Sequence, residues 1–199
     1  MKSIKEDFSL MAILLIPVAV AINMAGFGIV KLLQLPIFLD TVGTIFISFL
    51  AGPWIGAIAA ILTSIVSGMF DPVYLAYIPT SVFLALVAGF LARFKFGNNV
   101  IIKIAVSSLI LTTVAVVVSA PITVLVFGGS TGNMTSSITG LFLASGKQIW
   151  EAVISSTIIT EFADKLVTVI ICILILKSMS SRYLIKFKFG EKYINKSEK

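Results

Sequence analysis

Residues 147–177 form a mostly apolar stretch, long enough to cross a lipid bilayer, in which Glu161, Asp164 and Lys165 form a compact group of charges. An ionised group left in hydrocarbon costs about 3 kcal/mol on insertion scales. Glu161, Asp164 and Lys165 must therefore pair, reach a polar cavity or lie at the membrane interface. Glu161 precedes Lys165 by four residues, the favourable order for an ion pair on a helix, and Asp164 extends the same patch. Two interpretations stay open: an interfacial anchor with an internal ion pair, and a cluster that faces a ligand cavity.

The composition of the rest of the chain agrees with a membrane setting. Hydrophobic residues make up 58% of the sequence and charged residues only 12%, which is typical of an integral membrane protein. The single cysteine, Cys172, leaves no partner for an internal disulfide, and there is no histidine. A cysteine or histidine metal site and a Ser-His-Asp triad are thereby excluded. We expect no metal and no cofactor.

Six apolar segments predict an all-α integral membrane protein, a six-transmembrane-helix bundle that forms one domain over residues 1–199. Ala19-Val20-Ala21 resembles a signal-peptide cleavage site, but the apolar run around it continues too far for a signal peptide and predicts a spanning helix instead. Turn residues such as Pro36, Gly52-Pro53 and Asp71-Pro72 separate the segments. The predicted helices cover about 11–33, 37–51, 54–69, 74–94, 100–127 and 161–179, with a polar outer loop over 128–149.

The basic residues predict how the bundle is oriented. An even number of helices returns both termini to one side, and the excess of lysine and arginine on that side identifies it as cytoplasmic. We therefore expect a multi-pass protein of the bacterial plasma membrane, with its N- and C-termini in the cytoplasm and its basic tail against anionic lipid. This bias accounts for the net charge of +6 without nucleic acid. Only Lys31, Lys147 and Lys165 fall toward the outer side, whereas the other side collects Lys2, Lys5, Arg93, Lys95, Lys103, Lys177, Arg182, Lys186, Lys188, Lys192, Lys196 and Lys199.

The same orientation gathers acidic, amide and aromatic residues in the outer half of the protein. Aromatic faces that stack a flat polar ring, with carboxylates and amides that fix it, would form an outward-facing binding site. The alternative is an aromatic belt with solvated loops. The candidate substrate-binding residues are Asp40, Asp71, Tyr74, Tyr77, Asn133, Trp150, Glu161, Asp164 and Lys165.

Three stretches in order, FLDTVGTIFISFLAGPWIGAIAAILTSIVSG, GGSTGN and EFADKLVTVIICILIL, carry a family resemblance. The chain resembles the substrate-binding S component of an energy-coupling factor (ECF) vitamin transporter over roughly residues 11–177. The resemblance implies six helices, a vitamin site near the outer face closed by loops, and partnership with a transmembrane coupling subunit and two cytoplasmic ATPases. The chain itself has no G-x-x-x-x-G-K-[ST] phosphate loop, so we expect a transport subunit and not an enzyme.

The resemblance also gives a role to two small residues in the first apolar segment. Ala21 and Ala25 lie four residues apart, a spacing that lets helix backbones approach closely. In the family this surface docks on the coupling subunit, so Ala21 and Ala25 are the expected docking residues. Nothing in the pattern explains Asn23, which lies between them.

Two other classes of function remain open. A stand-alone secondary transporter is disfavoured because the chain is short and shows no internal repeat. A small intramembrane enzyme would use Glu161 and Asp164 as paired carboxylates, but Lys165 beside them favours neutralisation. The family takes up many vitamins on one scaffold. The acidic character of the outer half favours a small, neutral or cationic heteroaromatic such as pyridoxine or a thiamine precursor.

Overall fold

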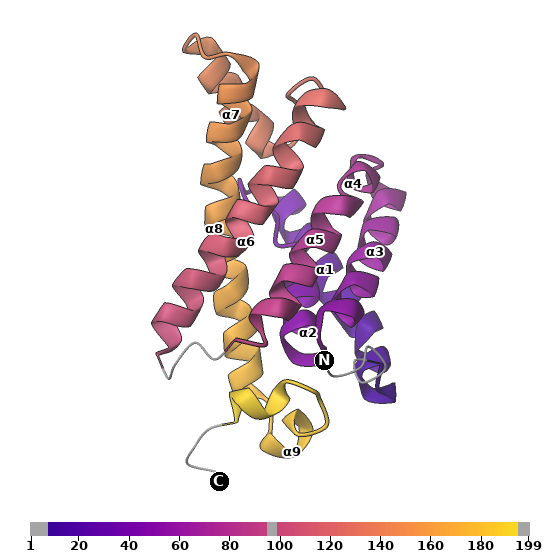
Figure 1. Cartoon of the computed structure of the whole chain (residues 1–199). Coiled ribbons are helices and arrows are strands. Elements are labelled where there is room, and N and C mark those ends of the chain that lie inside the picture. The colour runs from indigo at the N-terminus through magenta and orange to yellow at the C-terminus, as the bar shows by residue number, and fades with distance from the viewer. Residues whose placement is uncertain (1–7, 95–98, 195–199) are drawn as a thin grey trace.

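The computed structural model describes residues 8–94 and 99–194, and all regular structure in that part of the chain is helical (Figure 1). Three of the helices, α1, α3 and α6, are long and apolar enough to cross a membrane, which is the behaviour of an α-helical membrane protein. The elements are α1 (Leu10–Leu33), α2 (Val42–Ala51), α3 (Pro53–Phe70), α4 (Val73–Ala76), α5 (Ile78–Leu91), α6 (Val100–Leu125), α7 (Met134–Ala144), α8 (Ile149–Ser178), α9 (Ser181–Leu184) and the short 3-10 helix η2 (Gly190–Tyr193).

The structure places α1, α3 and α6 within two residues of their predicted ranges, whereas the other predicted segments differ. The segment predicted as a helix over 37–51 becomes helical only at Val42. The residues before it form an extended connection in which Leu39 has a φ of 49°, a value that few non-glycine residues adopt. The segment predicted over 74–94 is divided into α4 and α5 at Tyr77, because Pro79 lies in the first turn of α5, where a missing N–H costs no hydrogen bond.

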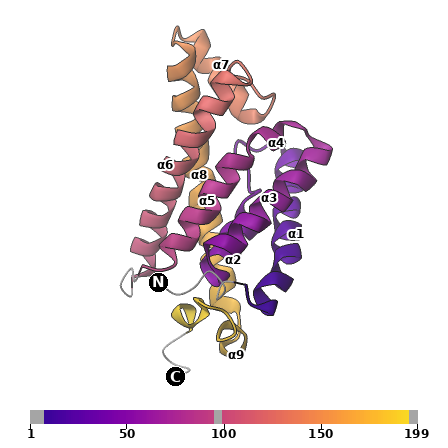
Figure 2. The same cartoon turned by 45° about the vertical axis from the view of Figure 1, so that its right-hand side comes forward.

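The largest correction concerns the predicted polar loop over 128–149 and the predicted helix over 161–179. Much of that loop is α7, and α8 begins at Ile149, twelve residues before the predicted start. The hydroxyls that made this region appear loop-like are partly buried between helices: Thr139 on α7 and Ser156 on α8 lie 2.6 Å apart through their hydroxyl oxygens. The two helices pack side by side as a hairpin at one end of the molecule (Figures 1 and 2).

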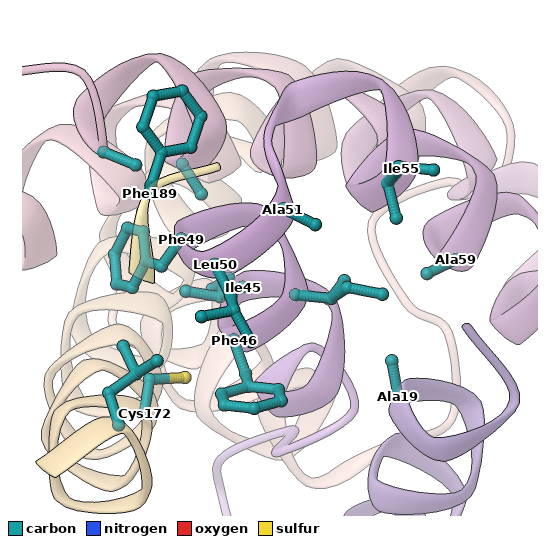
Figure 3. Close-up of a cluster of buried hydrophobic side chains, with 14 of the residues drawn as sticks. Ala19, Ile45, Phe46, Phe49, Leu50, Ala51, Ile55, Ala59, Cys172 and Phe189 are labelled. Carbon is teal, nitrogen blue, oxygen red and sulfur yellow. The ribbon is translucent and has the colours of Figure 1, made fainter. Parts of the chain in front are cut away.

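Helix α2 lies at the centre of the bundle. All ten of its residues are buried, and α1, α3, α5 and α8 pack around it. Its backbone crosses α1 so closely that a Cβ at Gly43 would collide with the carbonyl oxygen of Ala19. Figure 3 shows the aliphatic and aromatic side chains of α2, including Phe46 and Phe49, among residues from α1, α3 and α8. A helix of this length is about 15 Å long, half the thickness of a bilayer core.

The segment after α8 folds back beneath α2. The N–H of Phe189 donates to the carbonyl oxygen of Leu50 at 3.1 Å, and Leu184 and Phe187 are buried. Lys192 Nζ donates to the carbonyl oxygen of Arg93 at 3.0 Å, which joins this segment to the end of α5. The beginning of α1, the end of α8 and α9 therefore lie at one end of the bundle, and the hairpin of α7 and α8 lies at the other (Figure 2). We call these the closed end and the open end.

Candidate functional site

A cavity of about 120 Å³ lies at the open end of the bundle. Its wall is built from the connection between α1 and α2, the turn after α3, α4, the first turns of α5, the last turns of α6, the start of α7 and the middle of α8. A wider outer cavity of about 360 Å³ adjoins it, and both share Asp71, Tyr74 and Asn133. Segments that are far apart in the chain thus meet around one space.

The structure brings seven of the nine predicted site residues together in the lining of this cavity: Asp40, Asp71, Tyr74, Tyr77, Asn133, Glu161 and Lys165. Asp164 is fully buried behind the wall. Trp150 does not line the cavity, and its side chain is 41% exposed in the first turn of α8. The expectation for Trp150 was wrong because α8 begins much earlier than predicted and carries this residue beyond the cavity.

Lys165 is the centre of a buried charged cluster. Its Nζ lies 3.1 Å from Glu161 Oε2 and 2.6 Å from Asp164 Oδ2, which confirms the predicted ion pairing. It also donates to Thr41 Oγ1 at 3.4 Å. Glu161, Asp164 and Lys165 are only 6%, 0% and 2% exposed. These charges lie in the interior of the bundle, and two of them face the cavity.

Asp164 also holds the connection between α1 and α2 in place. Its Oδ1 accepts the N–H of Phe38 at 3.0 Å and the N–H of Leu39 at 2.8 Å. These bonds fix the left-handed backbone at Leu39, a conformation that is otherwise unfavourable. Asp164 therefore positions the part of the wall that carries Asp40 and does not itself reach the cavity.

Asp40 lies in this connection and interacts electrostatically with Asp164, Lys165 and Glu161. Burial in the cavity wall raises the pKa of Asp40 to about 7, the carboxylates of Asp164 and Glu161 act in the same direction, and Lys165 opposes them. At neutral pH the carboxyl group is thus divided between its protonated and ionised forms. A cation beside it would favour the ionised form.

Two tyrosines supply aromatic surface. Tyr77 stacks on Phe127 with ring centroids 5.8 Å apart, and its hydroxyl lies 2.7 Å from Thr123 Oγ1. Because Phe127 covers one face of the Tyr77 ring, a ligand can stack only on the other. The ring of Tyr74 packs edge-on against Phe27 at 5.1 Å. Burial raises the pKa of the Tyr74 phenol, with Asp40 and Asp71 adding to the effect, so its hydroxyl stays protonated.

The sequence did not reveal that hydroxyl groups dominate the cavity wall. Thr80 on α5 and Ser119 on α6 are only 6% and 5% exposed, and within the described part of the chain their hydroxyl oxygens have no hydrogen-bond partner. The only sequence signal was their closeness to Pro79 and Pro121 in apolar segments. The hydroxyl residues of the lining are Thr41, Thr80, Ser81, Ser119, Thr123, Thr131, Thr135, Ser136, Thr139 and Thr157, besides the two tyrosines.

Asn133 lies at the end of the loop that precedes α7 and borders the cavity. It is the N-cap of α7, and its Oδ1 accepts the N–H of Ser136 at 3.0 Å. The loop before it reverses direction through Gly128, Gly129 and Gly132, each with a positive φ that suits glycine. Asn133 thus shapes the rim and belongs to the lining of both cavities.

The first helix shows two different faces at residues 21–25. Ala21 and Ala25 are exposed on the outer face of α1, where nothing in the described chain covers them. Asn23 is fully buried on the opposite face. Its Nδ2 donates to Thr44 Oγ1 at 2.8 Å and Thr63 Oγ1 at 2.9 Å, and its Oδ1 accepts the N–H of Gly43 at 2.7 Å. Asn23 therefore joins α1, α2 and α3 and has a structural role.

The fold and the cavity were compared with known proteins. No family model, no curated protein and no solved structure matches this chain.

Proposed function

We propose that this protein is the substrate-binding S component of an ATP-driven ECF transporter, and that its cavity binds a small water-soluble vitamin or vitamin precursor. A heteroaromatic such as pyridoxine or a thiamine precursor suits the proposal best. The observation that carries it is the cavity: seven residues chosen from the sequence as ligand contacts line one space at the open end of the bundle. Ligand sites of this kind are concave and combine apolar walls with a few fixed polar groups.

The distribution of charge supports an outward orientation of that cavity. Among the described residues, the closed end carries Arg93, Lys103 and Lys177 at helix ends, together with the basic residues of the segment after α8. Positive charge favours the cytoplasmic side of a membrane. The proposal therefore has both termini in the cytoplasm of a bacterium and the open end outside. The six predicted crossings then include α2 and α5, which are shorter than a bilayer core. Helix α2 is buried along its whole length, whereas α5 also has an exposed side that carries Phe83 and Phe90.

The charged cluster supports binding in preference to acid-base catalysis. Glu161 and Asp164 both pair with Lys165, so neither carboxylate is a free general base. No ATP-hydrolysing motif is present in the sequence, and energy must come from partner proteins. In the proposed complex these are a transmembrane coupling subunit and two cytoplasmic ATPases.

The outer face of α1 suits the coupling subunit. Ala21, Ala25 and Gly28 are exposed and lie along one side of the helix, where small side chains allow another helix to approach closely. A Cβ added at Gly28 would meet no other atom, so this face is unobstructed within the described chain.

The proposal is tested by isolating the protein with its partners. We expect the full chain to co-purify with a membrane subunit and two ATPases, and native mass spectrometry of the complex to reveal a bound small molecule. Ala25→Trp should abolish co-purification and uptake while leaving that molecule bound, because the residue is exposed and does not belong to the lining of either cavity. Val117→Trp, at a 66% exposed position on α6, is the matched control and should change neither. Uptake that persists without ATPase partners would contradict the proposal and favour a secondary transporter.

A further inference from the structure

We propose that the cavity selects a small ring compound that carries one positive charge, with the charge held against Asp40 and Glu161. This inference rests on the proposed function, because it names the chemical class of ligand for the same site. It is carried by the balance of charge around the cavity, by two hydroxyls that lack partners and by the size of the space.

The charge balance in the cavity wall is negative. The carboxylates of Asp40, Glu161 and Asp164 surround a single ammonium, that of Lys165, so full ionisation leaves an excess of two negative charges. Asp71 at the mouth adds another carboxylate, and Lys165 is the only lysine or arginine in the cavity lining described here. Uncompensated charge is unfavourable in a low-dielectric interior. A cation in the cavity would neutralise part of the excess, whereas an anion would increase it.

Two buried hydroxyls point independently to a ligand. Thr80 and Ser119 are lining residues of the cavity, and their hydroxyl oxygens are almost completely buried and have no hydrogen-bond partner in the described chain. Buried polar groups are nearly always paired in native proteins, so such atoms at a cavity wall mark positions where a ligand or water supplies the partner. They come from α5 and α6, whereas Asp40 precedes α2 and Glu161 lies on α8. The ligand should therefore carry polar ring substituents besides its charge.

The volume and the aromatic surface limit the ligand to one ring in the inner cavity. A cavity of roughly 150 Å³ accommodates benzene, and the inner cavity here is about 120 Å³. Tyr77 lines the cavity, and a cationic ring placed over an aromatic face gains from the ring quadrupole. Within the described residues no group of three acidic, cysteine or histidine side chains is placed to hold a metal ion. The charge balance thus favours an organic cation.

The test compares ligands that differ only in charge. The full chain in lipid nanodiscs is titrated with pyridoxamine, pyridoxine and pyridoxate, and with benzylammonium, benzyl alcohol and benzoate; each series presents a cation, a neutral molecule and an anion on one ring. The cation of at least one series should bind about tenfold or more tightly than its neutral partner, the scale of a hydrogen bond to a charged group. The anions should not bind.

Substitutions test whether Asp40 is the residue that binds the positive charge of the ligand. Asp40→Asn should lower the affinity of the cation about tenfold and lower that of the neutral partner by a smaller factor. Glu151→Gln is the matched control, because Glu151 is an exposed acid on α8 outside the cavity, and it should alter neither affinity. Neutral or anionic members that bind as tightly as the cations would overturn the inference and leave the proposed function intact. If none of the six binds at millimolar concentration the inference also fails, and the co-purification and uptake experiment then decides the proposed function separately.

Discussion

The side chain of Asn23 on α1 caps the first turn of α2, with its Oδ1 2.7 Å from the amide nitrogen of Gly43. The N-cap residue of α2, Thr41, makes no side-chain capping bond of its own. A distant residue thus satisfies an amide that a local cap would normally satisfy. Its two further bonds, to Thr44 and Thr63, make Asn23 a junction of three helices.

Replacement of this junction should destabilise the fold. Asn23→Ala leaves the amide of Gly43 and the hydroxyls of Thr44 and Thr63 without partners in a site that water does not reach, so we expect a loss of about 3 kcal/mol in the free energy of unfolding. Thermal unfolding in detergent measures it. Thr113→Ala is the control, because that exposed hydroxyl bonds only to its own helix, and it should change stability by less than about 0.5 kcal/mol. Equal effects of the two changes would contradict the role of Asn23.

Replacement of Asp164 should lower both stability and ligand binding, whereas replacement of Glu161 should lower mainly ligand binding. Asp164→Ala removes the closest partner of Lys165 and two hydrogen bonds to the connection before α2, so we expect a loss of about 4 kcal/mol in stability together with loss of ligand binding. Glu161→Ala leaves the Asp164 pair intact and should impair binding more than stability. Calorimetry and binding isotherms on both variants separate the two effects. A Glu161 variant that unfolds as readily as the Asp164 variant would show that both residues have a purely structural role.

Removal of the two hydroxyls that lack partners should affect stability and ligand affinity in opposite directions. Thr80→Val and Ser119→Ala remove buried polar groups that have no partner, so the ligand-free protein should be as stable or more stable. Affinity for the tightest-binding of the six probes should fall by about 1 kcal/mol. Thr123→Val is the contrasting variant: its hydroxyl is paired with Tyr77, and its loss should lower stability. A stability loss in Thr80→Val would show that its hydroxyl is satisfied within the apoprotein.

The orientation in the membrane can be checked by chemical labelling. In a Cys172→Ser background, Ser137→Cys should react with an impermeant maleimide in intact cells, because the residue is exposed at the open end. Ser178→Cys, exposed at the closed end of α8, should react only after the membrane is permeabilised. The reverse pattern would place the cavity on the cytoplasmic side and exclude uptake from outside.

Cation binding should depend on pH through Asp40. The pKa of Asp40 in the ligand-free protein is raised to about 7, and the ionised form is the one that attracts a cation. Affinity for a permanently charged probe, 3-hydroxymethyl-1-methylpyridinium, should therefore rise roughly tenfold between pH 6 and pH 8, as the protonated fraction falls. Asp40→Asn should abolish this slope. The same slope in the variant would assign the titration to another group of the cavity, such as Glu161.

Local patterns predicted the local features of this protein. Glu161 and Lys165 are four residues apart on one helix, and the pairing expected from that spacing is present. The ranges of α1, α3 and α6 follow from long apolar runs between turn residues. These are properties of one segment at a time, and hydrophobicity and helical spacing describe them adequately.

Features that depend on distant contacts were missed. Asp164 binds the N–H groups of Phe38 and Leu39 across more than a hundred residues, and no local pattern marks that pairing. The abundance of serine, threonine and glycine over residues 128–140 predicts a loop, whereas α7 begins at Met134 and its Thr139 is buried against α8. Likewise Asn23 had no interpretation, since its partners belong to α2 and α3. In each case a polar side chain is satisfied by another helix.

The burial of α2 limits how the proposed transport could take place. The side chains of Ile45, Phe46, Phe49 and Leu50 are buried in one packed cluster with Phe189 of the folded-back segment (Figure 3). Phe187 belongs to the same cluster. The protein therefore has a cavity at its open end and a packed core around α2. In the proposed transport role, a ligand held in the cavity would have to pass this packed core, so its delivery to the far side would require the whole protein to reorient or a partner protein to open it.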